Sequence, residues 1–109
     1  ASDQITISVI KKGIWIPNVF SPNGDQVNDH FYPVLSDDSY KEIKSMSIYN
    51  RWGERIFLKE HFQPNNTLEG WDGTNRGLKL NPDVFIYSIE VLWNSGETEK
   101  FHGDVTLIK

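Results

Sequence analysis

Short stretches in which hydrophobic and polar residues alternate run along the whole chain, and turn-forming residues separate them. A period of two residues is typical of a β-strand with one buried face, and no stretch is convincingly helical. We expect strands over residues 5–10, 14–20, 31–35, 43–50, 55–59, 84–93 and 98–108. The pattern predicts an all-β fold, an immunoglobulin-like β-sandwich of about seven antiparallel strands.

Individual strands carry more specific signals. The stretch 84–93 is the longest and is apolar on most of both faces, which predicts a central strand. Pro17 lacks an N–H, so the strand over 14–20 is expected at a sheet edge or with a bulge. In the strand over 55–59, Ile56 and Leu58 alternate with polar neighbours and are expected to point inward.

Residues 60–82 form a long irregular segment with several turn signals. A loop of this length in a compact domain is usually held by a buried side chain. We expect Trp71 to place its ring in the core, with Asp72 capping the turn before Gly73.

Composition narrows the class of protein. The 109 residues fit one domain, and the absence of cysteine excludes disulfides and thiolate metal sites. No apolar run approaches the ~20 residues of a membrane-spanning helix. His30, His61 and His102 lie far apart, and serine-nucleophile elbows, phosphate-binding loops and zinc-binding helices are absent. We therefore expect no enzymatic activity.

The net charge of −4 is unevenly distributed. No lysine or arginine lies between Lys12 and Lys41, and this interval holds four aspartates: Asp25, Asp29, Asp37 and Asp38. Such an acidic stretch argues against nucleic acid or an anionic membrane as partner and suits a cation. Acidic loops that are merely solvated are the alternative.

One loop in this interval has the spacing of a calcium site. Side-chain oxygens of Asn23, Asp25 and Asp29, with the carbonyl of Val27, alternate around a glycine and could supply four or five ligands. Calcium takes six to eight oxygens, so further ligands would come from another loop or from water. The alternative is a cluster of Asx turns held by local hydrogen bonds. Calcium is accordingly the one cofactor that we predict.

Trp52 occupies a predicted hairpin turn between Arg51 and Gly53, where Gly53 can adopt a positive φ. An exposed tryptophan at such a turn can stack on a sugar ring. We expect instead that the ring packs onto the domain with the arginine lying along it.

Four motifs in fixed order resemble the gliding motility-associated C-terminal domain, the type B sorting domain of the type IX secretion system of Bacteroidota. The first, P-N-V-F-S-P-N-G-D-Q-V-N-D at 17–29, is similar to the family's P-N-x-F-[ST]-P-N-G-D-G-x-N-D. The others are I-Y-N-R-W-G at 48–53, W-D-G at 71–73 followed by Gly77, Pro82 and V-F-I-Y at 84–87, and G-D-V-T-L-I-K at 103–109.

Two positions depart from the family pattern. Gln26 replaces the usual glycine, which weakens the calcium interpretation, and Val84-Phe85 replaces a Pro-x-Gly-x-Tyr turn. The resemblance places the sorting domain at residues 14–109. Residues 1–13 are then a linker or the last strand of a preceding domain.

The resemblance implies an immunoglobulin-like domain that directs a large exported protein through the type IX outer-membrane translocon. After passage through the periplasm, the protein would reach the cell surface or the medium. The expected partners are the translocon, outer-membrane shuttle proteins and upstream cargo domains of the same chain, and not nucleic acid. Because the turns of a sandwich cluster at its ends, we expect the motif residues to form one recognition face: Asn23, Gly24, Asp25, Asn28, Asp29, Arg51, Trp52, Gly53, Trp71, Asp72 and Gly73.

Three alternatives remain at this stage. An exposed edge strand, such as the last one, could pair with a partner strand. The domain could be a calcium-stabilised surface-binding module for carbohydrate or adhesion. It could also be an immunoglobulin-like spacer within a long adhesin.

Overall fold

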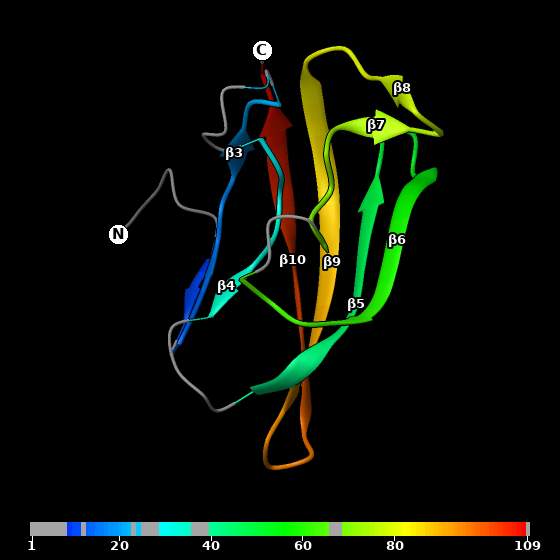
Figure 1. Ribbon diagram of the computed structural model, residues 1–109. Coiled ribbons are helices and arrows are strands. Elements are labelled where there is room, and N and C mark those ends of the chain that lie inside the picture. Colours follow the sequence, from blue (N-terminus) through cyan, green and yellow to red (C-terminus); the bar gives the residue numbers. More distant parts are fainter. Residues whose placement is uncertain are drawn as a thin grey trace.

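The computed structural model describes residues 9–11, 13–22, 24, 29–35, 40–65 and 69–108 (Figure 1). Over this part of the chain the structure is all-β, without an α-helix. The described strands are β1 (Val9–Lys11), β2 (Ile14–Ile16), β3 (Val19–Phe20), β4 (Val34–Leu35), β5 (Tyr40–Tyr49), β6 (Arg55–Phe62), β7 (Thr74–Asn75), β8 (Leu78–Lys79), β9 (Asp83–Trp93) and β10 (Thr98–Leu107).

Two of the three sheets that the described strands form are the layers of a sandwich. The larger sheet has the strand order β3-β10-β9-β5-β6, and the smaller has the order β1-β2-β4. Buried residues of both, such as Ile16 on β2, Leu35 on β4 and Ile89 on β9, belong to one hydrophobic cluster. The predicted all-β sandwich is confirmed. One pairing differs from the expected antiparallel set, because β3 runs parallel to β10.

Trp71 lies at the centre of this core with none of its surface exposed. Its ring centroid is 5.2 Å from that of Phe20 and 5.1 Å from that of Phe85. Its backbone exchanges two hydrogen bonds with Phe31, at 2.8 and 2.9 Å. The prediction that Trp71 anchors the long irregular segment is confirmed, because side chain and backbone both bind the segment to the sandwich.

The strand β9 is the longest and lies in the middle of the larger sheet, as its two apolar faces predicted. On the inner face, Phe85, Tyr87, Ile89 and Val91 are buried. On the outer face, the apolar residues of β9 near its start remain about two-fifths exposed. The apolar residues on the outer face therefore indicate that β9 is central in its sheet. They do not indicate that a second layer covers this face.

The predicted strand over 14–20 is two strands. It divides at Pro17 and Asn18, so that β2 pairs within the smaller sheet and β3 within the larger. Proline cannot donate a ladder hydrogen bond, and here the chain changes sheets at that point. The last strand is not an edge strand, contrary to our expectation, because β10 lies between β9 and β3.

The inward orientation predicted for Leu58 is wrong, since this side chain is 41% exposed. The β5–β6 register shifts between Ile48 and Tyr49, and Ile48 pairs with Phe57 while Tyr49 pairs with Arg55. One extra residue on β6 shifts the alternation of faces. Phe57 and Ile56 both pack against the core as a result.

The irregular segment contains a small hairpin, β7–β8, that sequence periodicity did not indicate. Strands of two residues are too short to show an alternation. Figure 1 places this hairpin at the same end of the molecule as the end of β10. At the other end of the chain, β1 pairs antiparallel with β2. Residues 1–8 lie outside the described residues, and the predicted domain boundary after residue 13 stays a prediction.

Candidate functional site

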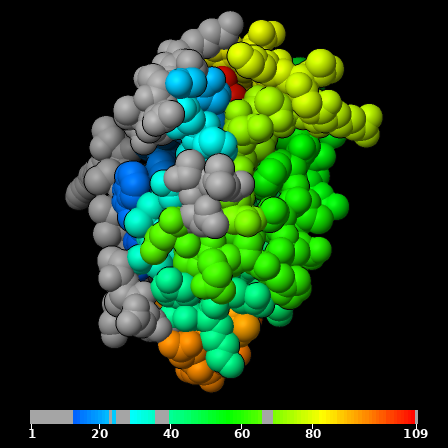
Figure 2. Space-filling view, in the orientation of Figure 1, coloured from blue at the N-terminus to red at the C-terminus, as the bar shows by residue number. Residues whose placement is uncertain are grey.

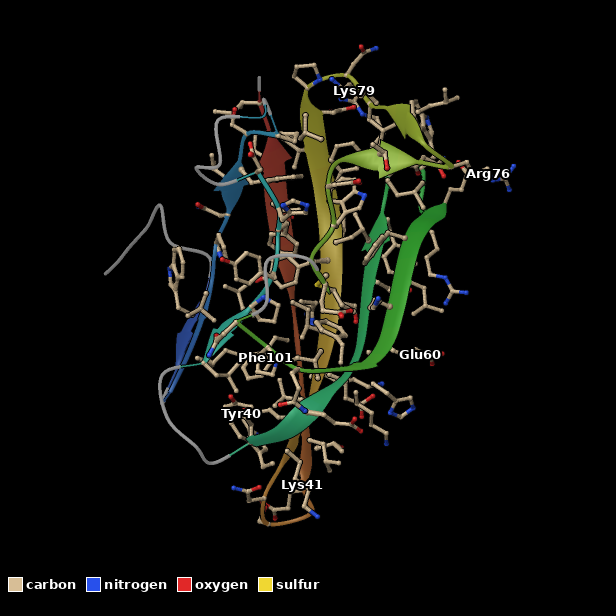
Figure 3. The ribbon with its side chains drawn as sticks, in the orientation of Figure 1. Tyr40, Lys41, Glu60, Arg76, Lys79 and Phe101 are labelled. Carbon is tan, nitrogen blue, oxygen red and sulfur yellow. The ribbon has the colours of Figure 1, made fainter. Side chains whose placement is uncertain are left out.

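A pocket of about 590 Å³ opens at the end of the sandwich where β10 finishes. Two predicted recognition motifs, more than forty residues apart in the chain, meet there. Gly24 and Asp29 come from the first motif, and Asp72 and Gly73 come from the W-D-G turn. The remaining wall comes from β8 and the loop after it, and from the end of β10, with Lys79, Leu80, Asn81, Leu107 and Ile108. Figure 3 labels Lys79 at this end of the molecule.

Local hydrogen bonds fix the W-D-G side of the pocket. Asp72 Oδ1 accepts hydrogen bonds from the backbone N–H and the hydroxyl of Thr74, at 3.1 and 2.7 Å. The indole N–H of Trp71 donates to the Thr74 carbonyl at 2.9 Å. The predicted capping role of Asp72 is confirmed.

Gly73 is required by two constraints. Its φ of +84° lies in the left-handed region, and a Cβ there would come within 3.0 Å of Leu107 and of Pro22. The W-D-G turn is therefore a rigid wall of the pocket, held between the core tryptophan and the end of β10.

The first motif contributes less to the described structure. Asn23, Asp25, Val27 and Asn28 lie outside the described residues, so the structure leaves the calcium prediction untested. Asp29 is described, and one of its carboxylate oxygens accepts a hydrogen bond from the Gly24 N–H at 3.1 Å. Within the described ranges, no three His, Cys, Asp or Glu side chains gather as a metal-binding group.

His30 was not among the predicted site residues, although it directly follows Asp29. It lines the pocket, and its Nδ1 atom is buried with no hydrogen-bond partner among the described residues. Buried ring nitrogens normally have a partner. The signal that could have identified it was its place immediately after an aspartate-rich motif.

The I-Y-N-R-W-G motif at 48–53 forms a hairpin turn that Asn50 organises. Its side-chain oxygen accepts hydrogen bonds from the N–H groups of Trp52 and Glu54, both at 3.0 Å. Its amide nitrogen donates to the Glu54 carboxylate at 2.9 Å. Gly53 has the predicted positive φ, at 82°. Asn50 was not predicted as a site residue, but asparagine before a turn glycine is a recognisable Asx-turn signal.

The expectation that Trp52 packs onto the domain is wrong, because the residue is 80% exposed. The arginine does lie over the ring, with Arg51 Cζ 5.7 Å from the centroid, as predicted. The hydrogen bonds that shape the backbone of the turn are local. The result is a tryptophan that a rigid turn presents to solvent.

Arg51 connects this turn to the start of β9. Its guanidinium donates a hydrogen bond to Asp83 Oδ1 at 2.5 Å. That bond, together with the N–H of Val84, lowers the pKa of the Asp83 carboxyl below the ordinary value of an aspartate. Asp83 is paired in register with Leu107, which lines the pocket. The turn therefore belongs to the same end of the sandwich but does not line the pocket.

The structure thus brings the first motif, the W-D-G turn and the end of the last motif (103–109) together at one pocket, and it places the I-Y-N-R-W-G turn at the same end of the sandwich. Trp71 lies beneath them in the core, fully buried and unavailable for contact with a partner. Among the described residues, no helix is long and apolar enough to cross a membrane.

Comparison with known protein families gives a match. A family model described as the CHU_C type IX secretion signal domain matches residues 14–107. No curated protein matches the chain. The match agrees with the resemblance carried by the four motifs, and it does not support the alternative of a carbohydrate-binding or adhesion module.

Proposed function

Because this chain belongs to the CHU_C family of type IX secretion signal domains, we propose that it carries attached cargo through the type IX outer-membrane translocon to the cell surface or the medium. The cargo would be the upstream domains of the same exported protein. The immediate partners would be the translocon and outer-membrane shuttle proteins. In this role the folded domain is a secretion signal that other proteins bind, and it needs no catalytic residue.

The observation that carries the proposed mode of recognition is the shared pocket. The first motif and the W-D-G turn, distant in sequence, line one hollow next to the end of β10. Only the folded chain presents these groups together, which favours recognition of a surface over recognition of a linear peptide. The exposed Trp52 supplies a second contact at the same end, and tryptophan is enriched among residues that dominate binding energy.

We also propose that calcium binds the loop over residues 23–29. Of its four expected ligands the structure describes Asp29, whose carboxylate is at the pocket and already accepts the Gly24 N–H. A bound calcium would fix this side of the pocket, since several oxygens would then hold the loop to one centre.

The export assay is the direct test. Residues 1–109 would be fused to the C-terminus of a reporter bearing a signal peptide, in a bacterium with a working type IX system. We expect reporter at the surface or in the medium, and loss of that signal when the translocon is deleted. Reporter that stays in the periplasm with the domain folded would contradict the proposal.

The same assay tests the recognition surface through Trp52→Ala. We expect export to fall severalfold, while the free energy of unfolding changes by no more than about 0.5 kcal/mol, because the side chain has little contact with the domain. Leu78→Ala is the matched control, since Leu78 is 72% exposed at the same end but belongs to none of the motifs. Equal export of Trp52→Ala and the parent chain would remove Trp52 from the recognition surface.

A further inference from the structure

The outer edge of β6 has no strand partner among the described residues. β6 is the last strand of the larger sheet and pairs on one side with β5. In an antiparallel ladder, alternate residues direct their backbone N–H and C=O groups away from the paired strand. Such an edge is a template on which another extended segment can form hydrogen bonds.

A groove of about 370 Å³ follows this edge. One side is the consecutive run from Glu54 to Leu58, and the other is the turn of the β7–β8 hairpin, with Asn75 and Arg76. Four of these five residues are consecutive on β6, and the bulge at Ile56 breaks the alternation of faces there, so the groove follows the strand and not one face of the sheet. Figure 2 shows the yellow hairpin standing out beside the green residues of this region.

The second half of β6 is closed to pairing. Lys59 Nζ makes an ion pair with Glu69 at 2.7 Å, which brings another segment of the chain against the strand. His61 has a φ of +54°, which breaks the extended geometry, and its ring bonds to Glu42. Natural sheets block edges with such features. The part of the edge without such a blocking contact is therefore Arg55 to Leu58, where the groove lies and where the bulge at Ile56 twists the strand.

The groove is locally cationic in a chain whose net charge is −4. Arg55 and Arg76 are both exposed, and neither has an ion-pair partner within the described ranges. The carboxylate of Glu54, also at the groove, already accepts a hydrogen bond from Asn50. Two free guanidiniums on opposite walls complement acidic side chains of an extended ligand.

Arg76 occupies a position that arginine rarely takes. Its φ is +56° and that of Gly77 is +82°, the combination of a tight hairpin turn that usually has asparagine or glycine first. A left-handed non-glycine residue costs free energy, and such strain gathers at functional sites. Figure 3 shows Arg76 at the outer end of the hairpin, pointing away from the sheets.

We propose that an extended, acidic segment of a partner protein binds this groove as an added strand on β6. Its backbone pairs with the edge from Arg55 to Leu58, and its carboxylates contact Arg55 and Arg76. This site goes beyond the sorting function, since none of its residues is in the predicted recognition set. It stands or falls independently of export.

The test uses the full 109-residue chain, labelled with ¹⁵N, and a synthetic capped peptide of sequence Thr-Glu-Val-Glu-Val-Glu-Thr. We expect saturable chemical-shift changes confined to Glu54–Leu58 and to Asn75 and Arg76. Amide hydrogen exchange along the open edge should slow in the complex. A peptide with lysine in place of glutamate should bind at least about tenfold more weakly.

Backbone pairing and charge are tested separately. A second acidic peptide carries N-methyl groups at alternate residues, so it keeps its charge but loses the backbone N–H donors along one of its edges. Methylation can start at the first or at the second residue, and one of these two peptides should not bind. The double variant Arg55→Glu with Arg76→Glu should weaken binding about tenfold or more. The control variant, Lys44→Glu with Lys100→Glu, changes the net charge by the same amount at exposed strand positions elsewhere. It should bind the peptide as tightly as the parent chain.

A second variant, Arg76→Asn, tests the same contact if Arg55→Glu with Arg76→Glu does not fold. Asparagine suits the left-handed turn position, so this variant should be at least as stable as the parent chain and still bind more weakly. The proposal is overturned by absent binding, by shift changes elsewhere, or by equal binding of methylated peptides. It is also overturned if sedimentation shows the chain dimerising through β6, because a second copy would then be the occupant.

Discussion

Asn50 gives the turn that carries Trp52 its shape. One side-chain oxygen accepts the N–H groups of Trp52 and Glu54, and the amide nitrogen binds the Glu54 carboxylate. The backbone adds a hydrogen bond from the Gly53 N–H to the Asn50 carbonyl at 3.0 Å. A single side chain therefore sets the direction in which the exposed tryptophan points.

Asn50→Ala is expected to remove three hydrogen bonds of this turn. Because the bonds are exposed, the free energy of unfolding should fall by only about 1 kcal/mol. Export should fall more than this small loss explains, since Trp52 would no longer be held in one position. Urea unfolding and the export assay measure the two effects. Ser95→Ala, which removes an exposed turn hydrogen bond in the β9–β10 hairpin at the opposite end, is the control.

Asp83, at this end of the molecule, has a carboxyl whose pKa its neighbours shift. The Arg51 guanidinium and the Val84 N–H favour its ionised form and lower the pKa of the carboxyl. A carboxyl with a lowered folded-state pKa contributes stability above the unfolded value of 3.8, and this contribution is lost as the pH falls through the folded-state pKa.

Arg51→Ala should therefore return the pKa of Asp83 towards 3.8. The difference in stability between this variant and the parent chain should be present at neutral pH and vanish in strong acid. Titration of the Asp83 carboxyl by NMR gives the pKa, and urea unfolding across the acidic range gives the stability. An unchanged pKa in the variant would mean that the ion pair does not form in solution.

At the scale of elements, the short strand β4 gains support from a side chain outside any strand. The Asn65 side chain accepts the N–H of Leu35 and donates to its carbonyl, both at 2.8 Å. Its own backbone adopts a φ of +63°, which asparagine tolerates better than most residues. The amide thus takes the place of a neighbouring strand at the free edge of β4.

Asn65→Ala should cost about 1–3 kcal/mol, because it leaves two backbone groups of Leu35 without partners and strains the left-handed position. Asn65→Asp should cost less than the alanine variant at neutral pH, since it retains one acceptor. Urea unfolding ranks the variants, and hydrogen exchange at Leu35 locates the effect. Equal stability of Asn65→Ala and the parent chain would exclude the strand-like role of this amide.

At the scale of the whole molecule, the calcium proposal links a loop to global stability. A ligand that binds only the folded state stabilises it by about 2.7 kcal/mol at one hundred times its dissociation constant. We expect the melting temperature to rise with calcium concentration and to return when a chelator is added. Asp25→Asn with Asp29→Asn should abolish this response.

The matched control is Asp37→Asn with Asp38→Asn, which removes equal charge from the same acidic interval outside the loop. A melting temperature that does not depend on calcium in the parent chain would leave the Asx-turn cluster as the explanation of the loop. If calcium raises the melting temperature of both double variants, the effect would be general screening of the negative charge in the acidic interval.

Much of the fold followed from local pattern. Alternation located the long strands β5, β9 and β10 because each presents several residues to one buried face. The same reasoning missed β7 and β8, which are too short to alternate, and misplaced Leu58, because a bulge is a property of two paired strands. The burial of Trp71 was predicted because a large apolar ring in a polar segment is most stable when it packs in the core.

Local sequence pattern predicted only part of the candidate site. The motifs identified Asp72, Gly73 and Asp29 as important, but they gave no sign that these residues share a pocket with Lys79 and Leu107. The exposure of Trp52 was also mispredicted, because burial depends on the surface that the rest of the fold leaves within reach.

The sequence by itself determined the all-β class, the central strand, the turns and the family, since each depends on residues that are near neighbours in the chain. The tertiary structure decided which sheet each half of the 14–20 stretch joins, which strands lie at edges, and which motif residues meet at the pocket. These depend on contacts between residues far apart in sequence, whose free energies arise only when both partners are folded and water is excluded between them.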